Sequence, residues 1–375
     1  MRIFKEELDA IKAFCESDKY TRENEKMLAR LKNSPIVLYG AGALGVKLAG
    51  ILINKGLDVA CFCDTYKTGV QKETGLPIIS PKALLDKHQE AVIVISAMYF
   101  IEEIRDYLLG LKIPSERIFS TDCFFNLEQV SREEVEKHID GYGSIFDVLE
   151  DDKSKDIVME RIKIYLSSLP IILDYNSSIV SPLKEQYFDA DIIQLTDNEI
   201  FIDGGLYIGD TAEQFIAKVN GKYKHYYGFE PDKDNFLQAE KKLVAYQNIT
   251  IVPKGLWCKE ERLCFDGGLA ASSAIGDTGT DYIDVISLDN YLPESVVPTF
   301  IKMDIEGAEF SALKGAERII RNHKPKLAIC AYHKMEDIYT LPELIKSYCS
   351  DYQFYFRHYT NSTAETVLYA VCKNK

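Results

Sequence analysis

Residues 201–211, FIDGGLYIGDT, constrain the fold more than any other part of the chain. They predict a buried strand, a tight turn at Gly204 and Gly205, and a helix that begins near Asp210. Glycine supports a positive φ and places no Cβ against a ligand, whereas Asp and Thr cap helix N-termini. Ligands of parallel α/β sheets bind at the carboxyl ends of the strands. We therefore expect a ligand near Asp203, Gly204, Gly205, Gly209, Asp210 and Thr211.

A second acidic residue follows one strand later. Residues 226–229 predict a buried strand that ends at Glu230 and Pro231. A carboxylate there can accept hydrogen bonds from the two vicinal hydroxyls of a ribose, and each such bond contributes about 1.5–3 kcal/mol. Alternatively, Glu230 only caps the helix that begins at Asp232. The spacing between the glycine turn and this acid is that of one βαβ unit, which favours the ribose interpretation.

The first half of the chain contains a GxGxxG motif at residues 40–45. An apolar strand precedes the motif, a helix follows it, and a second strand ends at an acid, as in dinucleotide-binding units. The candidate second nucleotide site therefore comprises Gly40, Gly42, Gly45 and Asp64. The region resembles small nucleotide-binding domains attached to sugar-modifying enzymes of bacterial glycan pathways. Two interpretations remain open: a site for a nucleotide or nucleotide-sugar, and a retained fold used for packing or dimerisation.

Composition excludes several classes of function. The net charge of −14 argues against a nucleic-acid partner, because phosphate binding needs clustered Lys and Arg. No apolar run approaches the ~18 residues of a membrane span, and the charged N-terminus lacks the apolar core of a signal peptide. Nine scattered cysteines without a CxxC pair indicate reduced thiols and argue against a zinc site. We expect a cytoplasmic protein.

The chain divides into four predicted parts: N-terminal helices over 1–34, a small Rossmann-like domain over 35–125, a helical linker or lid over 126–185, and a second α/β domain over 186–375. The last part ends in two aromatic and β-branched runs, 352–359 and 366–372, which predict an antiparallel hairpin. A parallel sheet that ends in such a hairpin is similar to class I methyltransferases and differs from a nicotinamide-binding Rossmann half. The predicted fold class is α/β, with two Rossmann-like domains, the second a class I methyltransferase fold with a C-terminal hairpin.

Three segments carry a more specific signature: 201–211, 227–231 and 301–316, the last containing MDIEGAE and LKGA. With these segments the second half resembles the FkbM family of S-adenosylmethionine-dependent methyltransferases. The resemblance implies S-adenosylmethionine as cofactor and a hydroxyl of a sugar or related product as methyl acceptor. It places the methionine part of the cofactor near the glycine turn and the ribose at Glu230. The adenine then lies near Gly255 and Trp257, although Trp257 alternatively belongs to the core.

Two residues are candidates for the chemistry of methyl transfer. Asp304 ends the strand that faces the transferred methyl group in this fold, and His333 ends the neighbouring strand. A general base raises the rate of such a reaction about 10²–10⁴-fold, and the alignment of the nucleophile with the methyl group raises it more. Alternatively, Asp304 and His333 ligate a divalent metal with Glu306, or His333 caps a helix. We expect no resident metal.

The leading hypothesis is an S-adenosylmethionine-dependent O-methyltransferase that acts on a hydroxyl of a sugar, glycan or related small polar product. The alternative is a non-catalytic scaffold of a glycan biosynthesis pathway that binds a nucleotide or nucleotide-sugar. A nicotinamide oxidoreductase is disfavoured, because no catalytic Lys, Tyr or His pair accompanies the GxGxxG motif. The N-terminal helices and the additional domain favour a homodimer.

Overall fold

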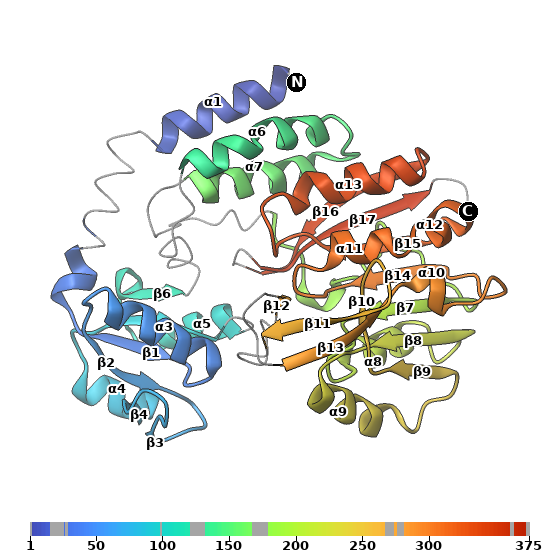
Figure 1. The fold of residues 1–375 in the computed structure, drawn as a ribbon. Coiled ribbons are helices and arrows are strands. Elements are labelled where there is room, and N and C mark those ends of the chain that lie inside the picture. Colours follow the sequence, from blue (N-terminus) through green and yellow to red (C-terminus); the bar gives the residue numbers. More distant parts are fainter. Residues whose placement is uncertain are drawn as a thin grey trace.

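The structure is a computed structural model that describes residues 2–15, 26, 29–97, 100–120, 132–166, 179–266, 274–275, 281–360 and 364–372. Parts of the expected N-terminal helices (16–25) and of the expected linker (126–131 and 167–178) lie outside the described residues. Figure 1 shows two α/β units. The smaller is built from the N-terminal half of the chain and the larger from the C-terminal half. The predicted α/β class is confirmed, with a mostly parallel sheet in each half of the chain.

The N-terminal sheet has six strands in the order β3-β4-β2-β1-β5-β6, and all neighbours are parallel except β3 and β4. Its strands are β1 (Ile36–Tyr39), β2 (Val59–Cys63), β3 (Gly69–Val70), β4 (Pro77–Ile79), β5 (Val92–Ile95) and β6 (Ile118–Ser120). Its helices are α3 (Ala43–Asn54), α4 (Pro81–Lys87) and α5 (Ile101–Gly110). Every residue of β1 and β5 is apolar and buried, as expected for a parallel sheet covered on both faces.

The C-terminal sheet has seven strands in the order β16-β17-β15-β14-β7-β8-β9. Five are parallel: β7 (Ile200–Gly204), β8 (His225–Phe229), β9 (Ile249–Val252), β14 (Phe300–Met303) and β15 (Lys326–Cys330). The antiparallel hairpin of β16 (Tyr352–His358) and β17 (Thr366–Cys372) ends the sheet, with β17 inserted beside β15. The predicted C-terminal hairpin is therefore confirmed, and the sheet has the class I methyltransferase order.

Helices cover both faces of this sheet: α8 (Asp210–Lys218), α9 (Lys233–Leu243), α10 (Leu288–Tyr291), α11 (Glu309–Lys314), α12 (Glu317–His323) and α13 (Asp337–Tyr348). A separate four-stranded sheet lies beside it, formed by β10 (Gly255–Leu256), β11 (Glu261–Asp266), β12 (Ala274–Ile275) and β13 (Asp281–Ile286). On one face of the main sheet, the rings of Phe201 and Phe300 stack with centroids 4.6 Å apart. Aromatic pairs of this kind contribute about 0.5–1.5 kcal/mol beyond the area they bury.

The N-terminal helix α1 (Arg2–Cys15) packs on the second domain rather than on the first sheet. It lies against α6 (Arg132–Phe146) and α7 (Asp152–Leu166), which in turn lie beside α13 (Figure 1). Phe4 and Leu8 of α1 are buried in the main hydrophobic core of the C-terminal half, and the ring of Phe4 lies 5.3 Å from that of Phe146. Burying each of these two side chains contributes about 1.5–3 kcal/mol. Helix α1 therefore packs on the second domain, although it precedes the first domain in the sequence.

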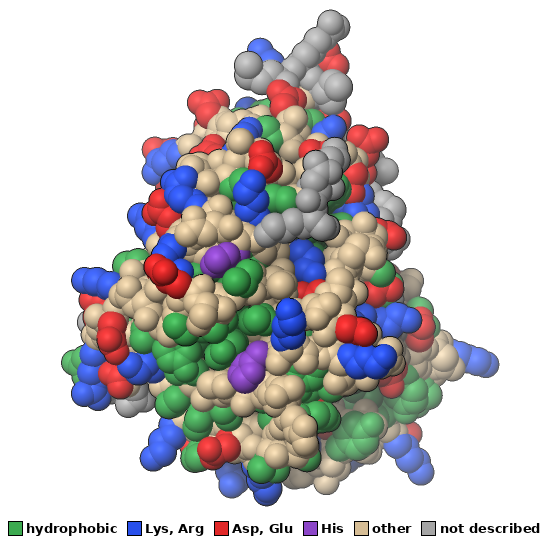
Figure 2. All heavy atoms as spheres, turned by 90° about the vertical axis from the view of Figure 1, so that its right-hand side faces the viewer, with side chains coloured by type: hydrophobic (Ala, Val, Ile, Leu, Met, Phe, Trp, Pro, Cys, Tyr) green, Lys and Arg blue, Asp and Glu red, His purple; other side chains and the backbone are tan. Residues whose placement is uncertain are grey.

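The outer surface is mixed in charge. Figure 2 shows acidic and basic side chains interspersed with apolar ones over the face on the right of Figure 1. Among the described helices, none combines the length and the apolar character that crossing a membrane requires.

Candidate active site

One cavity of about 1480 Å³ lies where the strands of both large sheets end. From the C-terminal half it is lined by residues that follow β7, β8, β14 and β15. From the N-terminal half it is lined by residues that follow β1, β2 and β5. Because ligands of parallel α/β sheets bind at the carboxyl ends of strands, this cavity lies where a ligand of either sheet is expected.

The glycine turn after β7 brings the chain into direct contact with the residue that follows β14. Gly205 has φ +79°, and a Cβ at this position would lie 1.8 Å from the carbonyl oxygen of Asp304. The amide of Asp304 donates to the carbonyl of Gly204 at 3.0 Å. Glycine is therefore required at position 205 both for its backbone conformation and for the close approach of the Asp304 loop.

Glu230 lies on the cavity wall with only 7% of its surface exposed. Its carboxylate accepts hydrogen bonds from the amides of Tyr207 at 2.8 Å and Asp232 at 2.9 Å. Burial outweighs these bonds and raises the pKa of Glu230 to about 7. The N-cap of α9 is Asp232, whose side chain accepts from the amide of Asn235. Helix capping is therefore carried out by Asp232, which leaves Glu230 facing the cavity.

The predicted cofactor residues fall into two groups. Six line the cavity: Gly205, Asp210, Thr211, Glu230, Pro231 and Gly255. Four lie behind it: Asp203, Gly204, Gly209 and Trp257. Gly209 is the N-cap of α8 with φ +85°, and Trp257 packs against the small cluster of Ile283 and Val285. These four residues do not line the cavity themselves.

Asp203 is fully buried and binds a lysine. The Lys302 ammonium lies 2.9 Å from an oxygen of Asp203, and the hydroxyl of Tyr226 donates to the other oxygen. Burial alone would lower the pKa of Lys302, but Asp203 and Asp304 outweigh burial and raise it, so the ammonium stays charged. Lys302 also donates to the carbonyls of Gly205 at 2.7 Å and Gly204 at 3.2 Å. Asp203 therefore supports the glycine turn through Lys302.

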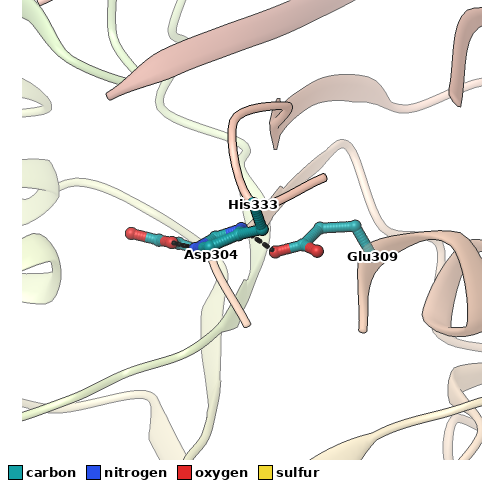
Figure 3. Close-up of side chains that lie close together, drawn as sticks. All are labelled: Asp304, Glu309 and His333. Atoms are coloured by element: carbon teal, nitrogen blue, oxygen red, sulfur yellow. Dashed lines mark ion pairs between the residues drawn. The ribbon is translucent and has the colours of Figure 1, made fainter. Parts of the chain in front are cut away.

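Asp304 and His333 lie together, as Figure 3 shows with Glu309. His333 Nε2 is 3.7 Å from Oδ1 of Asp304, and His333 Nδ1 is 3.1 Å from Oε1 of Glu309. Tyr187 donates its hydroxyl to Asp304 at 2.7 Å, and Tyr332 does so at 3.3 Å. The two candidate catalytic residues are therefore neighbours in a cluster of charged and hydroxyl groups at the ends of β14 and β15.

The charges of this cluster set the protonation of both residues. Burial alone would raise the pKa of Asp304, but Lys302, His333 and the Tyr187 hydroxyl outweigh it and hold the pKa below its usual range. Burial alone would lower the pKa of His333, but Glu309, Glu306 and Asp304 outweigh it and raise the pKa well above its usual range. Asp304 is thus ionised at neutral pH, and His333 carries a positive charge that stabilises it.

The glycine-rich turn of the first sheet borders the same cavity. Gly40, Gly42 and Asp64 line it, whereas Gly45 does not. A Cβ on Gly45 would lie 2.1 Å from the carbonyl oxygen of Gly40, so this glycine allows α3 to pack on the turn. Asp64 accepts from the amide of Ala41 at 3.0 Å and therefore also holds the turn in place.

Comparison with known proteins agrees with this geometry for the second half. Residues 203–356 match the family model described as the methyltransferase FkbM domain. The whole chain is similar to the solved structure of methyltransferase FkbM from Methylobacillus flagellatus KT. The two share 25% identity with a TM-score of 0.70, over 98% of this chain and 99% of that one. The chain carries an FkbM methyltransferase domain.

More distant structures match about half of the chain. An rRNA methylase from Streptococcus thermophilus is 17% identical with a TM-score of 0.33, over 48% of this chain and 90% of that one. Aeropyrum pernix fibrillarin, solved with natively bound S-adenosyl-L-methionine, is 12% identical with a TM-score of 0.30, over 48% and 70%. Among curated proteins, the comparison found no match to the chain.

Three residues that were not predicted as site residues contact the predicted ones. Lys302 of β14 stands two positions before Asp304 and neutralises Asp203, a partner that strand alternation alone does not predict. Tyr187 reaches Asp304 from a segment 117 residues earlier and has no local sequence signal. Glu309 lies in the first turn of α11, and its contact with His333 Nδ1 depends on the loop after β15.

Unusual backbone conformations gather around the same cavity. Four non-glycine residues that line the cavity have positive φ: Tyr187 (+67°), Tyr207 (+51°), Glu306 (+55°) and Glu365 (+65°). Such conformations cost about 1–3 kcal/mol each and concentrate at functional sites. Their gathering around one cavity supports its role as the active site.

Proposed function

We propose that this methyltransferase uses S-adenosylmethionine to methylate a hydroxyl of a sugar, glycan or related small polar product. The observation that carries the proposal is the direct contact between the glycine turn at Gly205 and the loop of Asp304. This contact places a candidate cofactor turn beside an ionised carboxylate that can accept a hydrogen bond from a hydroxyl. Methyl transfer requires both features at one point, because the acceptor oxygen must approach in line with the bond that breaks.

The residues of the cavity fit the cofactor. Glu230 supplies a nearly buried carboxylate for two ribose hydroxyls, and Gly205 lines the cavity at the turn where the methionine part is expected. Leu256, Ile283 and Val285 form an apolar wall next to Gly255, which suits the adenine ring. When bound, S-adenosylmethionine supplies a sulfonium-activated methyl group.

Asp304 has the geometry to orient the acceptor. Its oxygens already accept from the hydroxyls of Tyr187 and Tyr332, and it lines the cavity, so it can accept a third hydrogen bond from the acceptor. With the cofactor bound, the Asp304 carboxylate would accept the hydroxyl proton as the acceptor oxygen becomes methylated. Because its raised pKa keeps His333 protonated, the imidazolium cannot accept this proton, which leaves Asp304 as the acceptor.

We further propose that the first domain binds a nucleotide, in the simplest case the nucleotide part of a nucleotide-sugar acceptor. Gly42 is the N-cap of α3 and provides no side-chain cap, so the first amides of α3 are free to bind a phosphate. Lys47 and Lys67 line the cavity next to Gly40, Gly42 and Asp64 and supply positive charge. This arrangement supports a polar acceptor held partly by the first domain. We also propose, from the composition and the N-terminal helices, that the protein is cytoplasmic and homodimeric.

Calorimetric titration of the full chain with S-adenosylhomocysteine tests the proposed cofactor. We expect binding by the wild type, weaker binding by Glu230→Ala, and unchanged binding by the control Glu240→Ala, whose side chain is exposed on α9. A nucleotide-sugar panel titrated into the same protein tests the first domain. Binding of nucleotide-sugars without any binding of S-adenosylhomocysteine would refute the enzyme and support a non-catalytic scaffold.

A further inference from the structure

The carboxylates around His333 outnumber the positively charged groups that are close enough to pair with them. Its Nε2 is 3.3 Å from Oε2 of Glu306 and 3.7 Å from Oδ1 of Asp304, and its Nδ1 is 3.1 Å from Oε1 of Glu309. Asp337, which is 2% exposed, adds a fourth carboxyl group near Glu309, although its burial favours the neutral form of this group. One imidazolium cannot neutralise this group of carboxylates.

Two lysines near the cluster compensate only part of its negative charge: Lys302 attracts Asp304 from beyond ion-pair distance, and Lys334 attracts Asp337. Lys302 is committed to Asp203 and to two carbonyls, and Lys334 extends to the surface, where it donates to the carbonyl of Gly307. Within the described part of the chain, no Lys or Arg lies at ion-pair distance from Asp304, Glu306 or Glu309. Buried negative charge without a partner is costly, so the cluster favours a bound cation.

Buried polar atoms of His333 and Glu309 have no hydrogen-bond partner among the described residues. The side chain of His333 is 10% exposed, and neither ring nitrogen makes a well-aligned hydrogen bond within the described residues, although both are close to carboxylates. Oε2 of the fully buried Glu309 is likewise without a hydrogen bond there. These atoms are close enough for attraction but are not directed along one another's hydrogen-bond axes, as expected for ligands of a common ion.

The separations of the ligand atoms fit a small divalent ion. One oxygen of Asp304, one oxygen of Glu309 and one nitrogen of His333 all lie within 4.8 Å of one another. Opposite ligands of an octahedral ion with bonds of about 2.1 Å are about 4.2 Å apart, so only a small contraction is needed. Carboxylates suit Mg²⁺ and Mn²⁺, and the imidazole shifts the preference toward a transition metal such as Mn²⁺.

We propose that Asp304, Glu309 and His333 bind a divalent cation, for which Mn²⁺ is the probe, and that His333 gives up its proton when the cation binds. Glu309 closes the site on its buried side, whereas Asp304, Glu306 and His333 face the cavity and leave its other side open. Catalytic metal sites keep such an open position for water or substrate. Glu306, with 35% of its side chain exposed, stands at this open side.

Electron paramagnetic resonance of Mn²⁺ titrated into the full chain, without cofactor or acceptor, tests the proposal. We expect one Mn²⁺ per chain in the wild type. In Glu309→Gln and His333→Gln we expect affinity to fall at least about tenfold, which is the lower end of the loss seen when metal-site residues are changed. The control Glu317→Gln removes an exposed acid of α12 and should bind Mn²⁺ like the wild type.

Two results would overturn the cation site: no Mn²⁺ binding by the wild type at about 1 mM, the weak end of the range for carboxylate sites, or equal binding by wild type and both variants. Circular dichroism and S-adenosylhomocysteine binding show whether each variant is folded. If Glu309→Gln fails to fold, Glu306→Gln replaces it, because its side chain is partly exposed; unchanged affinity in that variant and in His333→Gln refutes the proposal. The cation proposal does not rest on methyl transfer, since Mn²⁺ and S-adenosylhomocysteine are titrated separately.

Discussion

The change Lys302→Met removes the positive member of the buried pair behind the glycine turn. Lys302 is 1% exposed and Asp203 is fully buried, with their charged atoms 2.9 Å apart. Methionine keeps most of the side-chain volume but leaves the Asp203 carboxylate and the carbonyls of Gly204 and Gly205 without their ammonium. The pair therefore links the stability of the FkbM domain to the shape of its cofactor turn.

The expected magnitude follows from burial. Breaking a buried ion pair by removing one partner costs about 3–5 kcal/mol, because the remaining charge stays uncompensated. In the double variant Asp203→Asn/Lys302→Met that charge is gone, and the hydrogen bond from Tyr226 can be kept by the amide oxygen. Replacing a whole buried pair is often close to neutral. We therefore expect the double variant to recover at least about 2 kcal/mol of the loss, a typical coupling between contacting residues.

Urea unfolding followed by tryptophan fluorescence measures both variants. Trp257 is the single tryptophan of the chain and lies in the FkbM domain, so its signal reports this domain. Parallel titration with S-adenosylhomocysteine should show weaker binding in Lys302→Met, because the two carbonyls of the turn lose their donor. A loss below about 1 kcal/mol in the single variant, the level of an ordinary surface pair, or a double variant less stable than the single one, would refute this reasoning.

Three further predictions concern the cavity itself. Burial raises the pKa of Glu230 from 4.5 to about 7, so above pH 4.5 the unfolded chain holds fewer protons than the folded one and stability falls as pH rises toward 7. In urea unfolding at a series of pH values, the free energy of unfolding of the wild type should decline by roughly 3 kcal/mol over this range, and Glu230→Gln should remove the decline. If wild type and variant show the same pH profile, the burial of this carboxylate is contradicted. Gly205→Ala should lower the free energy of unfolding by more than about 2 kcal/mol. The control Gly221→Ala, at a position with φ +72° and open space around its Cβ, should lower it by about 1 kcal/mol. Equal losses in the two variants on urea unfolding would rule out the contact with Asp304. Asp304→Asn should lower turnover about 10²–10⁴-fold and leave S-adenosylhomocysteine affinity nearly unchanged, and unchanged turnover in a methyltransferase assay would remove Asp304 from the reaction.

Much of the fold is encoded in short segments. The glycine turn, the acid at Glu230 and the C-terminal hairpin each depend on residues within one strand and its adjoining turn, where local conformation and alternation decide the structure. The resemblance of 301–316 to a family signature lies at the same local level and is borne out by the match over residues 203–356. These features were predictable because positive φ, strand burial and hairpin pairing leave a pattern along the chain.

The position of each functional group depends on the tertiary structure. The sequence predicted Asp203 near the cofactor and left Trp257 open between the adenine and the core, and only the tertiary structure shows that Asp203 pairs with Lys302 and that Trp257 packs on β13. Tyr187 meets Asp304 across 117 residues, and α1 returns to α6 and α7 across the whole first domain. Contacts between segments so distant in the chain leave no periodic pattern in the sequence. Packing alone decides which buried charge is paired, which faces the cavity, and which acids surround His333.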